Sequence, residues 1–425
     1  MLYDLGFFIF SLFYMPALIF KGKLHGEFSE RFGIYDKAKQ RALFSGKDRI
    51  WIQAVSVGEV ALCRSLIPLL KEKFPSTDIV ISTITKAGNE LARKIFGKDA
   101  IIIYFPLDFS FVVRKVAGII KPALYIMVET EIWPNLLKEL ERKSVPCVLI
   151  NGRISDRSIG KYRLAKLFLK NTFGRIRVFC MQDPVAADRI IELGAPRERV
   201  RVTGNMKFDV DFKSKSRNYE FVRRSFGLQR DEDLLVAGST HEGEEEVILA
   251  SYKELSSEFL NLKLLIAPRH IERVKSIEKM IRRSGLEPVR VSQFSSPANV
   301  RTCGQRILVM DTIGHLNEAY SVATIVFIGG SLVEYGGHNP IEPAVFGKAI
   351  IFGPHMFNFR YIADLFLKNR GAIRVSGKEE LCEKCTFLLT DVNARRIMGE
   401  NAERILSENS GATRKNIEAI SGILR

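Results

Sequence analysis

The sequence predicts an α/β protein built from two doubly wound, mainly parallel β-sheets. Three observations support this fold class: short apolar runs alternate with helical patterns, a glycine-rich loop follows one apolar run, and the chain has 425 residues. Alternation of this kind gives parallel strands that are covered by helices on both faces. A chain of this length exceeds what a single hydrophobic core usually organises. We therefore expect two domains that follow a short N-terminal segment.

The N-terminal segment, residues 1–22, has the composition of a membrane anchor. Residues 5–20, LGFFIFSLFYMPALIF, are almost wholly apolar, and Lys21 and Lys23 follow directly. A cleaved signal peptide would carry basic residues before its apolar stretch and small residues at its end, and both features are missing. We predict an uncleaved anchor, spanning or interfacial, with the body of the protein on the cytoplasmic side. A buried core helix is the alternative, because a spanning helix needs about 20 apolar residues.

Residues 23–210 form the first predicted domain. The predicted strands are 50–55, 79–84, 100–105, 123–128, 147–150 and 178–181, with helices at 61–74 and 87–96 among the segments between them. Residues 211–225, DFKSKSRNYEFVRRS, are polar and basic, and contain no apolar strand. We interpret them as the connection between the domains.

Residues 226–391 form the second predicted domain. Its predicted strands are 234–237, 262–267, 289–291, 307–310, 324–328 and 349–352, with helices at 244–255 and 271–284. Residues 392–425 are predicted to be helices that could cross back onto the first domain. Open α/β sheets bind ligands at the carboxyl ends of their strands. We therefore expect a cleft where the carboxyl ends of the two sheets face each other.

The most informative stretch is 326–354, VFIGGSLVEYGGHNPIEPAVFGKAIIFGP. The predicted strand at 324–328 is followed by Gly329, Gly330 and Ser331, and a second glycine pair precedes the segment His338-Asn339-Pro340-Ile341-Glu342. Glycines at the end of a strand let a ligand approach backbone N–H groups, and the start of a helix favours anions. We expect a nucleotide here, with Glu342 accepting hydrogen bonds from ribose hydroxyls. A glycine-rich turn without a ligand is the alternative.

Polar motifs also follow other predicted strands. In the first domain they are Ser56, Gly58 and Glu59 after the first strand, Glu129 and Glu131 after the fourth, and Lys207 at the end of the domain. In the second domain they are Ser239 after the first strand, Pro268, Arg269 and His270 after the second, and the stretch 311–315 after a later strand. Any one motif could be a helix cap or a turn. Six at equivalent places in two sheets indicate a site.

The two domains carry different kinds of candidate side chain. The second offers binders of phosphate and ribose, whereas Glu59 and Glu129 in the first could deprotonate an incoming hydroxyl. A base on one domain and a leaving group on the other would place attack on the opposite face of the sugar, as in inverting glycosyl transfer.

The net charge of +16, from 64 Lys and Arg against 48 Asp and Glu, fits nucleic acid, an anionic membrane or phosphorylated substrates. Nucleic acid is the weakest of the three, because the dispersed basic residues lack a recognised binding motif.

Cys382 and Cys385 form a lone CxxC without further ligands. Asp209 and Asp211 have DxD spacing, but we interpret them as polar linker residues. We expect no metal and no cofactor.

Several segments together resemble the 3-deoxy-D-manno-octulosonic acid (Kdo) transferases of lipopolysaccharide assembly. They are WIQAVSVGEV, VETEIWPNLL, NGRIS, VTGNMKFD, GSTHEGEEE, APRHIER, DTIGHL and GGSLVEYGGHNPIEPAVFGKAIIFGP. The resemblance runs in register from about residue 1 to past residue 360. The family implies a GT-B fold, with transfer of Kdo from CMP-Kdo to a lipid A precursor at the cytoplasmic face of the bacterial inner membrane. The expected partners are CMP-Kdo, the lipid A precursor and anionic inner-membrane lipids, without nucleic acid.

The resemblance also implies roles for individual residues. Glu59 is similar to the family's catalytic base, and Glu129 and Lys207 to its transition-state stabilisers. The implied CMP site consists of Pro268, Arg269, Ile313, Gly314, His315, Asn339, Pro340, Ile341 and Glu342. Glu30, in the segment SERFG, is a second candidate, with a role on the acceptor side. Further candidates are Ser56, Gly58, Glu131, Ser239, His270, Gly330, Ser331 and His338.

The chain departs from the family pattern at four positions. Val128 stands where Met is usual, Gln53 replaces His, Ile271 replaces Pro, and His315 replaces Glu. His315 matters most, because imidazole can change its charge near neutral pH and thereby alter binding of the donor.

Two alternatives stay open: an enzyme of the same fold that uses another sugar nucleotide, such as a UDP-sugar transferase or epimerase, and a non-catalytic, membrane-associated nucleotide-binding module.

Overall fold

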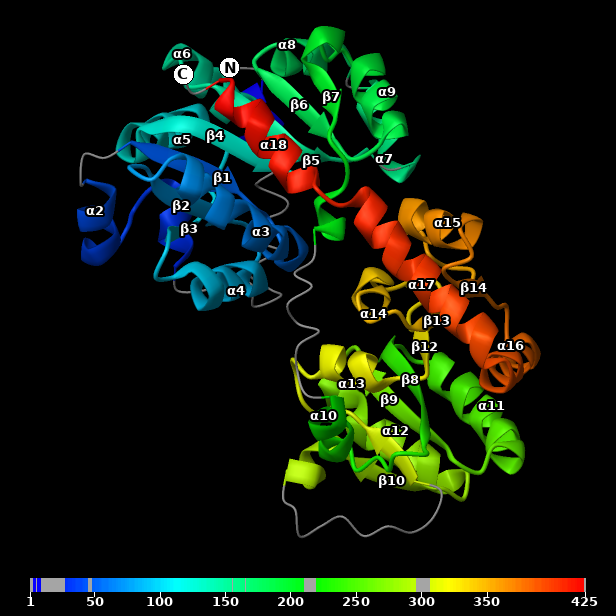
Figure 1. Cartoon of the computed structure of the whole chain (residues 1–425). Coiled ribbons are helices and arrows are strands. Elements are labelled where there is room, and N and C mark those ends of the chain that lie inside the picture. The colour runs from blue at the N-terminus through cyan, green and yellow to red at the C-terminus, as the bar shows by residue number, and fades with distance from the viewer. Residues whose placement is uncertain are drawn as a thin grey trace. The chain divides into compact units, whose positions relative to one another are not determined.

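The computed structural model describes residues 3–4, 6–8, 27–44, 48–154, 156–164, 166–209, 219–295 and 306–423 (Figure 1). The chain divides into two compact units. Unit 1 contains residues 1–209 and 410–425, and unit 2 contains residues 210–409. Each unit is an α/β structure with its own parallel sheet of seven strands. The predicted fold class is confirmed to this extent.

The sheet of unit 1 has the order β3-β2-β1-β4-β5-β6-β7, and the strands pair in parallel. The strands are β1 (Arg49–Gln53), β2 (Asp78–Thr83), β3 (Ile101–Tyr104), β4 (Pro122–Val128), β5 (Cys147–Gly152), β6 (Val178–Met181) and β7 (Val200–Val202). The α-helices are α2 (Lys37–Leu43), α3 (Val57–Lys73), α4 (Lys86–Phe96), α5 (Ser110–Ile120), α6 (Pro134–Arg142), α7 (Asp156–Leu164), α8 (Lys166–Phe173), α9 (Pro184–Glu192) and α18 (Ala412–Ser421). Short 3₁₀ helices are η1 (Phe28–Phe32), η2 (Arg197–Arg199) and η3 (Met206–Phe208).

The core of unit 1 has two layers, one on each face of this sheet. Trp51, Tyr125 and Leu149 lie in one layer, whereas Ile52 and Ile126 lie in the other. Neighbouring residues of one strand enter opposite layers because side chains alternate across a strand. Both layers are apolar, so the strands appear in the sequence as continuous apolar runs rather than as alternating patterns.

The sheet of unit 2 has the order β10-β11-β9-β8-β12-β13-β14 and is also parallel. Its strands are β8 (Asp233–Thr240), β9 (Leu262–Pro268), β10 (Glu287–Arg290), β11 (Arg306–Val309), β12 (Ile325–Ile328), β13 (Ala349–Phe352) and β14 (Ile373–Arg374). The α-helices are α10 (Tyr219–Ser225), α11 (Glu244–Glu258), α12 (Val274–Arg283), α13 (Leu316–Val322), α14 (Ile341–Ala344), α15 (Arg360–Lys368), α16 (Lys378–Thr390) and α17 (Val392–Asn409). The 3₁₀ helices are η5 (Ile271–Arg273) and η6 (Val291–Ser295).

Several boundaries differ from the sequence-based interpretation. Part of the predicted connection, Tyr219–Ser225, forms α10 of unit 2, where Val222 and Arg223 are buried. Helix α17 belongs to unit 2, and the final helix α18 belongs to unit 1, where it packs on α3 and β6 (Figure 1). The short edge strands β7 and β14 were not predicted, because runs of two or three residues carry too little pattern.

The predicted N-terminal anchor lies mostly outside the described residues, which include only residues 3–4 and 6–8 of its 22. Within the described ranges, no helix is both long and apolar enough to cross a membrane. The first residues contact unit 1: Asp4 Oδ1 accepts hydrogen bonds from Ser110 N and Asn135 Nδ2, both at 2.9 Å. The Phe7 ring meets the Phe109 ring edge-on, with 4.9 Å between centroids.

Candidate functional site

In unit 1, the topological switch point lies between β1 and β4, because the chain continues from β1 to β2 on one side and returns to β4 on the other. The loops after β1 and β4 are therefore neighbours at the carboxyl edge, which is where open α/β sheets bind ligands. Glu59 lies in the first turn of α3, directly after β1, and Glu129 directly follows β4. This topology is why two carboxylates 70 residues apart in sequence belong to one site.

The Glu59 carboxylate folds back on the loop that precedes α3. It accepts hydrogen bonds from Val55 N at 2.5 Å and from Ser56 Oγ at 3.1 Å. Glu59 is only 7% exposed. The pKa of Glu59 is raised to about 8, mainly by burial. The nearby carboxylates of Glu129 and Glu131 also raise this pKa, whereas the hydrogen bond from the Val55 N–H lowers it. A carboxylate with this pKa can accept a proton near neutral pH.

Glu129 has a left-handed backbone, with φ at 59°, and its N–H donates to Ile150 O at 3.0 Å. A non-glycine residue in this conformation is uncommon and often belongs to a functional loop. Burial raises the pKa of Glu131, and the charge of Glu129 raises it further. Glu59, Glu129 and Glu131 therefore form a cluster of mutually repelling carboxylates, which calls for a cation nearby.

Lys207 supplies that cation. It lies in η3, whose first turn is capped by the Asn205 side chain, which accepts a hydrogen bond from Lys207 N at 3.0 Å. Met206 N donates to Asn151 Oδ1 at 2.9 Å, so the loop is also held against the end of β5. Burial lowers the pKa of Lys207, while the charges of Glu129 and Glu59 oppose this shift. The three residues that the resemblance assigns to catalysis thus lie within electrostatic reach of one another.

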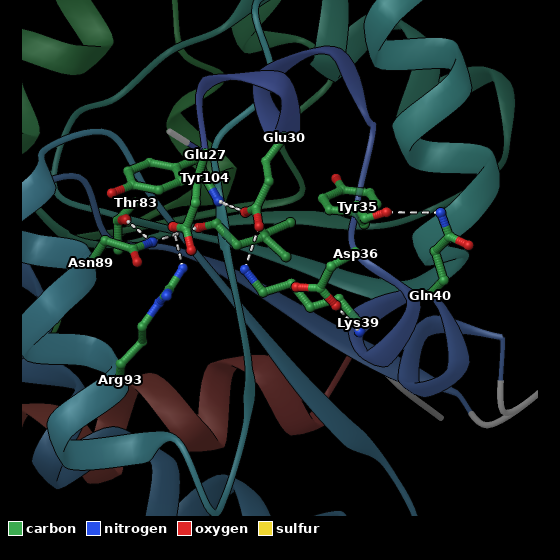
Figure 2. A network of polar contacts seen from close by, with 11 residues as sticks. Glu27, Glu30, Tyr35, Asp36, Lys39, Gln40, Thr83, Asn89, Arg93 and Tyr104 are labelled. Atoms are coloured by element: carbon green, nitrogen blue, oxygen red, sulfur yellow. Dashed lines mark hydrogen bonds and ion pairs between the residues drawn. The ribbon is translucent and has the colours of Figure 1, made fainter. Parts of the chain in front are cut away.

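Glu30 lies elsewhere in unit 1, at the edge strand β3 (Figure 2). Its carboxylate accepts a hydrogen bond from Tyr104 N at 3.1 Å and pairs closely with the Lys39 ammonium. Glu30 is 4% exposed. These contacts fasten η1 and α2 to the end of β3, so the described geometry gives Glu30 a structural use. Its predicted acceptor-side role stays a prediction.

In unit 2, the switch point lies between β8 and β12. Ser239, the next-to-last residue of β8, has a φ of 59°, and the loop after the strand leads into Glu244 at the start of α11. The buried Glu244 carboxylate accepts four backbone hydrogen bonds: from His241 N at 3.0 Å, Gly330 N at 2.6 Å, and Ser331 N and Leu332 N at 2.9 Å each. Glu244 therefore joins the two loops at the switch point.

This arrangement changes the role expected for the first glycine pair. The sequence suggested that the N–H groups of Gly330 and Ser331 would bind a ligand anion. In the structure, Glu244 is the anion that these groups bind. Gly329 serves close packing, since a Cβ there would lie 2.4 Å from Ser239 O. These N–H groups thus already have a protein partner that braces the loop after β12, and the nucleotide expected at this loop stays a prediction.

Three histidines gather beside this brace. His241 Nε2 lies 2.9 Å from His338 Nε2, so one ring donates and the other accepts. Tyr335 stacks on His241 with 4.0 Å between ring centroids, and His270 meets His241 edge-on at 5.9 Å. The pKa of His338 is lowered to about 4, mainly by burial and also by the charges of His241, Arg269 and His270. His338 is therefore neutral at physiological pH.

The segment 339–342 lies next to this cluster. Asn339 Oδ1 accepts a hydrogen bond at 3.1 Å from the N–H of Ile341, the first residue of α14, while Asn339 Nδ2 donates to Glu342 Oε1 at 3.3 Å. Burial raises the pKa of Glu342, and the Asn339 hydrogen bond and the charge of Arg269 oppose the shift. Pro340 and Ile341 are buried in the turn, and Pro268 ends β9 just before the exposed Arg269. The structure thus brings together residues from the loops after β9 and β12.

Ile313, Gly314 and His315 lie in an exposed loop between β11 and α13. Ile313 is 87% exposed, and Gly314 has a left-handed φ of 99°. His315 Nδ1 lies 2.9 Å from Glu318 Oε2, so a carboxylate remains beside the position where the family usually has Glu.

The other three departures from the family pattern lie outside this loop. Gln53 is buried and accepts a close hydrogen bond from the Tyr125 hydroxyl, Val128 is buried in β4, and Ile271 begins η5.

Sequence analysis assigned no structural role to three residues that prove important at these loops: Glu244, His241 and Asp209. The pattern offered one signal for Glu244, because an acidic residue in the first turn of a helix often accepts backbone N–H groups. It offered no signal for the partners of Glu244 in the loop after β12. Ser56 and Gly58 lie in the turn that presents Glu59. Among the described residues, no group of three or more His, Cys, Asp or Glu is placed to hold a metal ion.

Comparison with known proteins identifies the family of the chain. Residues 26–210 match the family model described as 3-deoxy-D-manno-octulosonic-acid transferase (kdotransferase). A relative from Haemophilus influenzae named 3-deoxy-D-manno-octulosonic acid transferase is 33% identical over 401 residues, covering 93% of this chain and 91% of the relative. A relative of the same name from Chlamydophila psittaci is 32% identical over 414 residues, covering 96% and 92%.

Solved structures are similar in fold. A glycosyltransferase from Rickettsia africae has a TM-score of 0.62 at 11% identity, covering 89% of this chain and 99% of its own. UDP-GlcNAc 2-epimerase from Neisseria meningitidis, bound to UDP-GlcNAc, has a TM-score of 0.61 at 12% identity, covering 88% and 99%. These identities are too low to indicate more than a shared fold. The full-length sequence relatives decide the family: the chain belongs to the 3-deoxy-D-manno-octulosonic acid transferases, a family of glycosyltransferases.

Proposed function

We propose that this protein transfers Kdo from CMP-Kdo to a lipid A precursor of the lipid IVA type, with inversion at the anomeric carbon and with Glu59 as general base. The observation that carries the proposal is the environment of Glu59. Its carboxylate is buried, is held by Val55 N and Ser56 Oγ, and has a pKa of about 8. Such a group takes up a proton near neutral pH and is oriented before the substrate binds.

In the proposed step, a hydroxyl oxygen of the acceptor forms a bond to the anomeric carbon of Kdo while its proton moves to Glu59. The bond from this carbon to the phosphate oxygen breaks, and CMP leaves with the bonding electron pair. Lys207, beside Glu129 and Glu59, carries a positive charge that would stabilise the negative charge that develops on CMP as it leaves. Glu129, with its constrained backbone, holds this ammonium in place.

We assign binding of the donor to unit 2. Arg269 follows β9 and is exposed, so its guanidinium is available to an anionic group. Glu342 and Asn339 can meet ribose hydroxyls, since both lie at the start of α14. The neutral His338 and its neighbour His241 can donate hydrogen bonds to phosphate or to the Kdo carboxylate without the desolvation cost of an imidazolium.

We place the enzyme at the cytoplasmic face of the inner membrane, where anionic lipids would contact unit 1. Asp4 and Phe7, at the start of the apolar stretch of the sequence, contact the starts of α5 and α6. Phe111 stacks on Phe109 with 5.7 Å between centroids and is 67% exposed. Exposed aromatic rings beside an apolar segment suit the interface between water and lipid.

A transfer assay with CMP-Kdo and a tetraacylated lipid A precursor tests the proposal. We expect the product mass to rise by whole Kdo units. Glu59→Gln should lower kcat by roughly 10²–10⁴-fold, while the thermal shift caused by CMP persists, because the assigned CMP residues belong to unit 2. Glu72→Gln, an exposed change on the same helix α3, is the matched control and should leave kcat unchanged.

Two results would contradict the proposal. One is stabilisation of the protein by UDP-sugars and not by CMP or CMP-Kdo, which would favour another sugar nucleotide. The other is full transfer activity in the Glu59→Gln variant, which would remove the base from the mechanism.

A further inference from the structure

Asp209 is the last residue of unit 1 before the chain enters unit 2, and it directly follows η3, which carries Lys207. The chain re-enters unit 1 at Ser410, just before α18. The first crossing therefore begins two residues after the predicted catalytic lysine, and the second ends beside Gly411, which contacts Asp209. The DxD spacing at Asp209 and Asp211 drew attention to this place in the sequence without giving it a role.

The Asp209 carboxylate clamps the returning chain. Its Oδ1 accepts a hydrogen bond from Gly411 N at 2.6 Å, and its Oδ2 accepts hydrogen bonds from Thr413 N and Thr413 Oγ1, both at 2.5 Å. A carboxylate in this position binds the free N–H groups of the first turn of α18 and matches the positive end of the helix. Asp209 thus caps a helix that lies two hundred residues later in the sequence.

Helix α18 in turn holds the loop on the other side of Lys207. A Cβ at Gly204 would lie 3.3 Å from Ala412 Cβ, so the backbone before η3 packs tightly on the first residue of α18. Thr413 Oγ1 also lies 3.1 Å from Ser65 Oγ on α3, the helix that carries Glu59. Ala412 and Met206 belong to the same apolar cluster as the inner side of α3. The start of α18 therefore connects η3 with α3.

We infer that Asp209 is a positioning residue for Lys207, which acts by fixing η3 on α18 and thereby holding the lysine beside Glu59 and Glu129. This inference depends on the proposed function, in which Lys207 contributes to transfer. A lysine side chain is long, and its ammonium loses hydration when it is buried. Its place beside two carboxylates therefore requires a firmly held backbone. Asn205 and Asn151 hold the start of η3, and Asp209 holds its end.

A purely structural role for Asp209 is the competing explanation, since loss of any helix cap lowers stability. Asp183 provides the matched control. It caps α9 of the same unit by accepting a hydrogen bond from Ala186 N at 2.7 Å, and it takes no part in the proposed site. Asp183→Ala should lower the melting temperature to a degree similar to Asp209→Ala and leave kcat unchanged.

The experiment measures kcat, the KM for CMP-Kdo and the melting temperature of the full-length protein. We expect Asp209→Ala to lower kcat roughly 10- to 100-fold, as misplacement of a catalytic group by about 1 Å does, with little change in KM for the donor. In the double variant Lys207→Ala/Asp209→Ala, kcat should equal that of Lys207→Ala alone, because Asp209 acts through Lys207.

The inference is overturned if Asp209→Ala behaves like Asp183→Ala, or if the two losses multiply in the double variant. If Asp209→Ala does not fold, Asp209→Asn decides. It keeps one acceptor oxygen for the first turn of α18 and should give an intermediate kcat; a normal kcat in this variant counts against the inference. Absence of transfer by the unaltered protein would instead contradict the proposed function.

Discussion

At the scale of single residues, the environment of Glu59 sets the pH dependence that we predict for transfer. A base must be ionised, and burial raises the pKa of Glu59 to about 8. We expect kcat/KM to rise with pH through an ionisation near 8 and to level off above it, because this parameter reports the free enzyme. A profile that is flat between pH 6 and 9 would contradict this role.

The same ionisation has a consequence for stability. The folded pKa of Glu59 lies above its ordinary value of 4.5, so its favourable contribution is complete below pH 4.5 and is lost as pH rises through about 8. Glu59→Gln should therefore be more stable than the unaltered protein at pH 9, by on the order of 3 kcal/mol. The difference should shrink toward pH 5. Urea unfolding at both pH values measures it, with Glu72→Gln as the control.

Residue patterns predicted part of the site and missed the rest for a definable reason. Sequence motifs pointed to Glu59, Glu129 and Lys207, and in the structure these three residues lie close enough for their charges to interact. Glu244 and Asp209 look in the sequence like ordinary acidic residues near helices or linkers. Their partners, such as Gly330 N and Thr413 N, lie 86 and 204 residues away. Only the folded chain decides which distant backbone N–H groups reach a carboxylate.

At the scale of elements, Glu244 joins the loop between β8 and α11 to the loop after β12. We expect Glu244→Gln to lower the free energy of unfolding by roughly 1–3 kcal/mol and to weaken CMP binding. The amide has one acceptor oxygen in place of two, so its NH₂ group would face N–H groups that the carboxylate now satisfies.

Chemical denaturation and CMP titration measure these two effects. Glu246→Gln is the matched control, because Glu246 lies in the same first turn of α11 but is exposed. It should change stability by less than about 0.5 kcal/mol. Equal behaviour of the two variants would show that the carboxylate does not brace the loops.

Elements with a strong pattern were predicted well. The apolar runs assigned to strands correspond to β1–β6 and β8–β13, because strands covered on both faces contain consecutive apolar residues. Helix α10 was taken for a linker, since its sequence YEFVRRS is short and mostly polar. Its stability comes from packing, with Val222 buried and Arg223 donating to the carbonyl groups of Gln229 and Glu232.

At the scale of the whole molecule, net charge and exposed aromatic rings predict how the protein associates with membranes. We expect the full-length protein to bind vesicles that contain phosphatidylglycerol, and to bind less as salt rises, because its net charge is +16. Phe111→Ser should weaken binding about tenfold or more, since burial of a Phe ring contributes about 1.5 kcal/mol or more.

Co-sedimentation with vesicles measures this binding. Phe387→Ser is the matched control: Phe387 lies on α16 of unit 2 and is 46% exposed. Equal losses in the two variants would contradict a membrane-facing surface at Phe111. Salt-independent binding would contradict the electrostatic part of the prediction.

The sequence by itself determined the class of fold, the positions of most strands along the chain, and the residues at their carboxyl ends. Local apolar runs and short motifs encode these features, and such patterns are legible over ten or twenty residues. The tertiary structure alone decided that Glu244, and not a ligand, binds the N–H groups after β12, and that Asp209 caps the final helix. Those contacts join segments far apart in sequence, and packing of the complete units is what brings their atoms within hydrogen-bonding distance.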